Sequence, residues 1–86
     1  MTMACKSWRL SLDDPYLPLI PDGFFKAAFK GAKFFVRRPE HVYVYYDTKA
    51  AAYDGMKPIR GKMSVRLLPC KFRHIPENED GAVVIE

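Results

Sequence analysis

The chain has 86 residues and a formal net charge of +4 at pH 7. This length accommodates one small domain, which excludes multidomain enzymes, paired Rossmann halves and (β/α)₈ barrels. Apolar residues make up 49% of the sequence, too much for a disordered chain, and two cysteines are too few for a disulfide scaffold.

The positive charge is concentrated in the middle of the chain. Residues 26–73 carry twelve Lys and Arg against three Asp and Glu, whereas residues 1–25 have a net charge of −1 and residues 74–86 a net charge of −4. We therefore predict a single basic domain over residues 1–76, followed by an acidic tail or edge strand over residues 77–86. A strongly basic body favours an anionic partner.

The N-terminal region contains no continuous apolar segment of the kind found in signal peptides. Its longest uncharged run, Pro15–Pro21, is far too short to span a bilayer. We therefore expect a cytoplasmic protein with no membrane partner, in which Cys5 and Cys70 are reduced thiols.

The first two segments are a strand and a stiff connector. Ser7–Leu12 alternates polar and apolar residues, as a half-buried strand does. Three prolines in Pro15–Pro21 exclude a helix interior and favour an extended connector. We expect the apolar side chains of this connector, Leu17, Leu19 and Ile20, to pack on the core.

A helix is predicted next, with Asp22 as its N-cap and Gly31 as the residue after its C-cap. The apolar side chains of this segment fall on one helical face: Phe24, Phe25, Ala28 and Phe29. Of these, we expect Phe25 and Phe29 to be buried.

Two β-prone runs follow, Lys33–Arg38 and His41–Tyr46. A type I turn over Arg38–His41, with Pro39 at its second position, would join them into a hairpin.

The last part of the chain predicts a short helix and two strands. Asp47 can cap a helix over Thr48–Asp54 that ends at Gly55. Met63–Leu68 alternates as a strand, and Ala82–Ile85 is a short β-prone end.

The order of elements is β-α-β-β-α-β with a short final strand. We therefore predict an α+β fold, a small antiparallel sheet with one well-formed helix and one short helix. A ferredoxin-like (split βαβ) arrangement fits this order, with a curled SH3-like sheet as the alternative.

No catalytic constellation is present, so we expect no enzymatic activity, cofactor or small-molecule substrate. The loop Gly55–Lys62 has five residues between its glycines and Met63 after the lysine, which breaks the P-loop pattern. Cys70, His74 and Glu77 supply only one close Cys/His pair, whereas structural zinc sites usually have two, so no metal site is predicted.

The hairpin carries the strongest functional signal. If Phe34 and Val36 face the core together with Val42 and Val44, aromatic and arginine side chains remain on the outer face, joined there by His41. With the cations of the Gly55–Lys62 loop, the predicted partner-binding residues are Phe35, Arg37, Tyr43, Tyr45, Lys57, Arg60 and Lys62.

Aromatic rings interleaved with arginine on a sheet form a stacking platform for unpaired bases, and the same residue types form protein-binding hot spots. We therefore expect a non-enzymatic binding protein whose basic, aromatic-bearing surface docks on nucleic acid or a nucleoprotein complex. The alternative is a small inhibitor or modulator that binds an acidic surface of a larger or host protein, for example a viral or mobile-element anti-defence protein. In a third interpretation the outer face is covered by the chain itself and has a structural role only.

Overall fold

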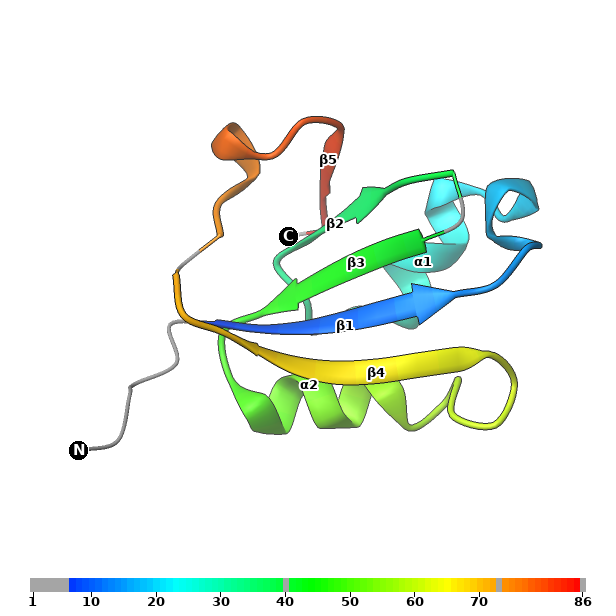
Figure 1. The fold of residues 1–86 in the computed structure, drawn as a ribbon, viewed down its shortest axis with the longest axis horizontal. Helices are drawn as coiled ribbons and strands as arrows, with labels where there is room; N and C mark the ends of the chain where they lie inside the picture. Colours follow the sequence, from blue (N-terminus) through cyan, green and yellow to red (C-terminus); the bar gives the residue numbers. More distant parts are fainter. Residues whose placement is uncertain (1–6, 40, 73, 86) are drawn as a thin grey trace.

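The computed structural model describes residues 7–39, 41–72 and 74–85. It has an α+β fold in which a five-stranded antiparallel sheet carries two α-helices (Figure 1). The strands are β1 (Ser7–Asp13), β2 (Phe34–Arg37), β3 (His41–Tyr46), β4 (Ser64–Cys70) and β5 (Ala82–Val84). The helices are α1 (Asp22–Ala28) and α2 (Lys49–Met56), accompanied by the 3₁₀ turns η1 (Leu17–Leu19) and η2 (Pro76–Asn78).

The strands follow the spatial order β4-β1-β3-β2-β5, and every neighbouring pair is antiparallel. The first strand therefore lies inside the sheet, where β3 pairs with one of its edges and β4 with the other. The predicted α+β class and small antiparallel sheet are confirmed.

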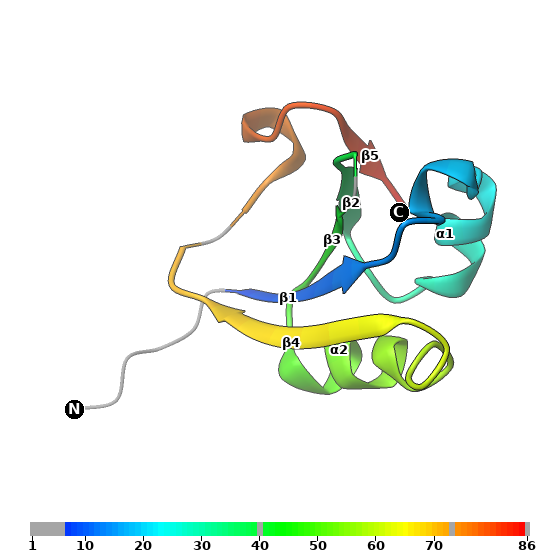
Figure 2. The same ribbon diagram turned by 45° about the vertical axis from the view of Figure 1, so that its right-hand side comes forward.

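Side-chain alternation along the two central strands determines where the core lies. Leu10 and Leu12 of β1 and Val42 and Val44 of β3 point to one face of the sheet and are fully buried. Both helices cover this face, with α1 over one end and α2 along β4 (Figure 2). The main core therefore lies between the helices and this side of the sheet, which we call the helix face, and a smaller buried cluster lies on the opposite side.

Helix α1 confirms the predicted burial of Phe25 and Phe29 but not the predicted ends of the helix. The N-cap is Pro21, and the Asp22 carboxylate is an ion-pair partner instead of a cap. The helix ends at Ala28 with Phe29 as its C-cap, so Gly31 lies beyond the end of the helix.

The proline-rich connector folds into the 3₁₀ turn η1 and does not stay extended. Leu17 is fully buried and Ile20 partly buried, as expected, but Leu19 is 79% exposed. Successive side chains of a 3₁₀ turn point in different directions, so Leu17, Leu19 and Ile20 cannot all face the core.

Helix α2 begins one residue later than predicted because Thr48, not Asp47, is its N-cap. The Thr48 hydroxyl accepts a hydrogen bond from the Ala51 amide at 3.2 Å. The helix continues through Gly55 to Met56, so this glycine does not end it.

Residues 82–84 are an edge strand of the same sheet. Ala82 pairs with Val36 and Val84 with Phe34 across the β2–β5 ladder. The Arg38 guanidinium also donates to the Asp80 carbonyl at 3.1 Å, which links the acidic C-terminal region to the basic hairpin.

In the described part of the chain, neither α-helix approaches the length or apolar character needed to cross a membrane.

Candidate functional site: the open face of the sheet

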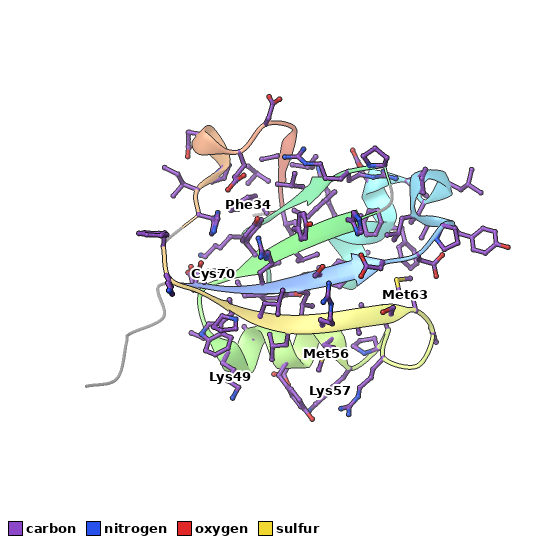
Figure 3. All side chains as sticks on the ribbon, viewed as in Figure 1. Phe34, Lys49, Met56, Lys57, Met63 and Cys70 are labelled. Atoms are coloured by element: carbon purple, nitrogen blue, oxygen red, sulfur yellow. The ribbon has the colours of Figure 1, made fainter. Side chains whose placement is uncertain are left out.

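The sheet face opposite the helices carries the candidate site, and we call it the open face. Alternation and strand register bring to it side chains from five strands: Arg9 and Ser11, Phe34 and Val36, Tyr43 and Tyr45, Arg66 and Leu68, and Ala82 and Val84. Phe34 marks this face in Figure 3, whereas Met56 is the last residue of α2 and Lys57 is its C-cap. The residues come from segments far apart in sequence, and the β4-β1-β3-β2-β5 order brings them together.

The hairpin register contradicts the predicted positions of Phe35 and Arg37. Val36 lies opposite Tyr43 and Phe34 opposite Tyr45, so these four share the open face. Phe35 and Arg37 therefore point to the helix face. The prediction had paired the two arms one residue out of step, which exchanges the two faces of one arm.

On the helix face these two side chains have structural contacts. The ring of Phe35 is fully buried, with its centroid 5.3 Å from that of Phe25. The Arg37 guanidinium donates to the Asp22 carboxylate and to the Leu17 carbonyl, both at 2.8 Å. It therefore links β2 to α1 and η1, and neither Phe35 nor Arg37 contributes to the open face.

Tyr43 lies near the centre of the open face and is half-buried. The guanidinium carbon of Arg9 lies 4.8 Å from the centroid of its ring, within the range of a cation–π contact. The ring of His41 lies nearly parallel to that of Tyr43, with 6.4 Å between centroids. Tyr43 thus keeps the outward orientation that the alternation of His41–Tyr46 predicts.

Arg9 forms no ion pair with any carboxylate of the described residues. Its Nη1 donates to the Tyr45 hydroxyl at 3.5 Å. Burial acts to lower the pKa of the guanidinium, but the hydrogen bond and charge of Tyr45 outweigh it, so the net pKa is raised. Arg9 is therefore a permanent cation that lies over the aromatic side chains of β3.

A second cation extends the open face toward β4. Arg66 Nη2 lies 3.6 Å from the Asp13 carboxylate, which also contacts His41 Nδ1. The Arg66 side chain is nevertheless 64% exposed. Its charge is thus positioned by Asp13 but remains accessible to an anion from solution.

The connection between β4 and β5 covers Tyr45, which is 4% exposed. Its ring stacks on Phe34 with 4.6 Å between centroids, and the ring of His74 lies 4.7 Å away. His74 Nδ1 lies 2.5 Å from Glu79 Oε1. Tyr45 therefore shares the open face with Tyr43 as predicted, but the prediction that it faces solvent is wrong.

Burial also raises the pKa of the Tyr45 phenol, and the neighbouring Arg9 offsets part of the shift.

The predicted loop cations are exposed but lie beside α2. Lys57 Nζ is 3.4 Å from the Asp54 carboxylate, and Arg60 Nη1 lies 3.4 Å from the Tyr53 hydroxyl. Lys62 belongs to the same loop and is exposed. Because α2 packs on the helix face, the fold does not bring these cations together with Tyr43.

Two residues of the open face, Arg9 and Arg66, are absent from the sequence-based prediction. The sequence contains a signal for both, because each lies in a predicted strand directly before a leucine, Leu10 after Arg9 and Leu67 after Arg66. Neighbouring side chains of a strand point to opposite faces, so burial of the leucine turns the arginine to the other face. That they lie near each other follows only from the pairing of β1 with β4.

Within residues 7–39, 41–72 and 74–85, no three His, Cys, Asp or Glu side chains gather in a way that could hold a metal ion. Cys70 is a buried free thiol. Comparisons with protein-family models, curated proteins and solved structures found no match to the chain.

Proposed function

We propose that this protein is a non-enzymatic binding protein whose open face receives single-stranded nucleic acid, alone or within a nucleoprotein complex. The observation that carries the proposal is the arrangement of Tyr43 on a central strand, with Arg9 over its ring and Arg66 exposed on the second strand along. Neither α1 nor α2 covers this part of the sheet (Figure 2).

The chemistry of these side chains matches that of an unpaired nucleotide. A base can stack on a tyrosine ring whatever its identity, and stacking of this kind contributes about 1–3 kcal/mol per base. Arginine forms bidentate hydrogen bonds with phosphate oxygens and also stacks on aromatic planes. Tyr43 would therefore hold a base while Arg66 and Arg9 contact the flanking phosphates.

The sheet architecture supports this proposal. We propose that the fold is ferredoxin-like and not SH3-like, because its first four strands follow the order β4-β1-β3-β2 with both helices on one face. Such an arrangement leaves the part of the other face that carries Arg9 and Tyr43 without a covering α-helix. Residues presented there are held by backbone ladders on both sides, which fixes their spacing for a ligand.

Fluorescence anisotropy with labelled single-stranded RNA and DNA oligonucleotides tests the proposal. Tyr43→Ala should weaken binding by about 1–3 kcal/mol, because it removes the stacking surface. Arg66→Gln should weaken binding and flatten its salt dependence. Arg60→Gln is the matched control, since it removes the same charge from an exposed arginine beside α2.

Equal effects of the two arginine substitutions would mean that only overall charge matters, and would contradict a site on the open face. No binding of either oligonucleotide at low salt would refute nucleic acid as the partner.

A protein partner is the second candidate, and a separate observation favours it. Three large apolar side chains of η1 and α1 and their flanks are strongly exposed: Tyr16 by 69%, Leu19 by 79% and Phe24 by 50%. Tyrosine and phenylalanine are enriched in protein interfaces. A pull-down from nuclease-treated lysate that depends on Leu19 and Phe24, but not on Tyr43, would favour this candidate.

A further inference from the structure

The connection that follows β4 presents the aromatic ring of Phe72 to solvent, with 77% of the residue exposed. Its backbone is nevertheless tied to the sheet, because the buried Ser7 hydroxyl donates to the Phe72 carbonyl at 3.2 Å. Cys70, which is labelled in Figure 3, is the buried last residue of β4 and the register partner of Ser7. The ring of Phe72 is therefore held in an exposed position by a backbone anchored on both strands.

Phe72 lies at one end of the open face. Alternation along β1 places Ser7, Arg9 and Ser11 on this face, in that order. Ser11 is the register partner of Tyr43, whereas Ser7 contacts the backbone of Phe72. The backbone position of Arg9 therefore lies between those of the two aromatic residues along β1.

The spacing along β1 sets the length of a ligand that reaches both rings. Ser7 and Ser11 are four residues apart, which corresponds to about 13 Å in a strand. Stacked nucleotides of one strand are about 3.4 Å apart, so this distance corresponds to roughly four steps of a stacked strand. A dinucleotide is therefore too short to contact both rings, whereas an oligonucleotide of about eight residues is long enough.

We propose that Phe72 is a second base-stacking residue of the open face, so that one single strand contacts Tyr43 and Phe72 together. The inference deepens the proposed function and rests on it. A base of any identity stacks on an aromatic ring, and the exposed ammonium of Lys71 lies next in the chain to meet a phosphate. Arg9 supplies a cation between the two rings.

The alternation of rings with cations is what favours a single-stranded nucleic acid over an apolar partner. Bases and phosphates alternate along a single strand, and proteins that bind it combine stacking rings with a basic path along the backbone. An apolar protein or membrane partner is recognised by a contiguous apolar patch. Here the exposed ring of Phe72 instead adjoins an exposed lysine.

Fluorescence anisotropy with labelled single-stranded oligonucleotides of two and eight residues tests the proposal. Phe72→Ala should weaken binding of the octanucleotide by at least about fivefold, because one stacked base is lost. It should change the affinity for the dinucleotide by less than about twofold, since a dinucleotide can bind at Tyr43 alone. An effect of Phe72→Ala that is the same at both lengths would contradict a strand that spans the two rings.

Phe24→Ala is the matched control, because it removes the same ring from an exposed position on α1. It should leave the affinity for both oligonucleotides unchanged. Equal losses from the two phenylalanine substitutions would overturn the proposal. Phe72→Ala should also keep the original melting temperature, since its ring is strongly exposed.

Two further substitutions identify what the ring contributes. Phe72→Tyr should retain the affinity for the octanucleotide, because it keeps a flat aromatic ring. Phe72→Leu should lose as much affinity as Phe72→Ala, because leucine is apolar but offers no surface for stacking. Full affinity of the leucine variant would show an apolar contact and would contradict base stacking.

The two proposals can fail separately. If the octanucleotide binds through Tyr43 and Phe72→Ala has no effect, the proposed function holds and the second stacking residue is wrong. If Phe72→Ala weakens binding of the octanucleotide and Tyr43→Ala does not, the strand does not span both rings, and both proposals are contradicted.

Discussion

Gly55 shows how a single side chain can reverse an intrinsic helix preference. It lies inside α2, where alanine is normally about 1 kcal/mol better than glycine. A Cβ at this position would collide with the phenol of Tyr46, which is buried in the core. We therefore expect Gly55→Ala to lower the free energy of unfolding by about 1–3 kcal/mol, measured by urea denaturation.

Gly23 provides the matched control for that substitution. It lies in α1, and a Cβ there would have no atom within 4 Å. Gly23→Ala should therefore leave stability unchanged or raise it by up to about 1 kcal/mol. If both alanine variants are more stable than the original protein, the close packing of Gly55 against Tyr46 is contradicted.

Tyr46 itself carries a buried hydroxyl that finds no hydrogen-bond partner among the described residues. Burial raises the pKa of this phenol above its ordinary value of about 10. The native state therefore binds more protons than the unfolded state at alkaline pH, so stability is lost as pH rises above about 10. Tyr46→Phe should stabilise the protein by about 1 kcal/mol at neutral pH and flatten this alkaline loss.

Denaturation curves at about pH 8 and about pH 11 would check both effects. A Tyr46→Phe protein that is less stable at neutral pH would show that the hydroxyl makes a favourable contact.

At the scale of elements, α1 depends on one row of phenylalanines. The rings of Phe25 and Phe29 stack with centroids 6.2 Å apart, and Phe29 is 1% exposed. Phe29→Ala should cost about 3–5 kcal/mol, a large part of the stability of so small a domain. Phe24→Ala, which removes a ring that is 50% exposed, should cost much less. Similar melting temperatures for the two variants would contradict the assigned helix face.

The elements themselves could be predicted from the sequence, because each depends on local patterns. Turn residues and alternation predict β1, the β2–β3 hairpin and β4. The row of phenylalanines on one helical face predicts α1 and the burial of Phe25 and Phe29. The faces of β2 could not be assigned from composition, since Phe34, Phe35 and Val36 are all apolar and all buried. Only register decides between them, and the hydrogen bond from the Arg38 amide to the His41 carbonyl, at 2.7 Å, belongs to the observed register.

The covering of Tyr45 could not be predicted for a different reason. It depends on His74, which is 29 positions away in sequence and reaches Tyr45 only because β4 and β5 lie on opposite edges of the sheet. The connection between these strands must therefore cross one face. Local patterns contain no information about which face it crosses.

At the scale of the whole molecule, the charges are distributed over three regions. Arg9 and Arg66 lie on the open face, whereas Lys57 and Arg60 lie beside α2. The acidic residues of the C-terminal region lie around η2, close enough to the hairpin for Arg38 to contact the Asp80 carbonyl. The positive field that an anionic ligand meets is therefore reduced by the chain's own carboxylates.

This arrangement predicts that the acidic region weakens binding of polyanions. Deleting residues 77–86 would remove β5 from the sheet, so neutralisation is the cleaner change. Glu77→Gln combined with Asp80→Asn removes two exposed negative charges and leaves the His74–Glu79 contact intact. The variant should bind single-stranded oligonucleotides more tightly at low salt.

The gain in affinity of this variant should shrink as salt rises, because the Debye length falls from about 30 Å at 0.01 M to about 3 Å at 1 M. Affinity measured from low to high salt checks the prediction, and a gain that persists unchanged in 1 M salt would show that the carboxylates act by contact and not through their field.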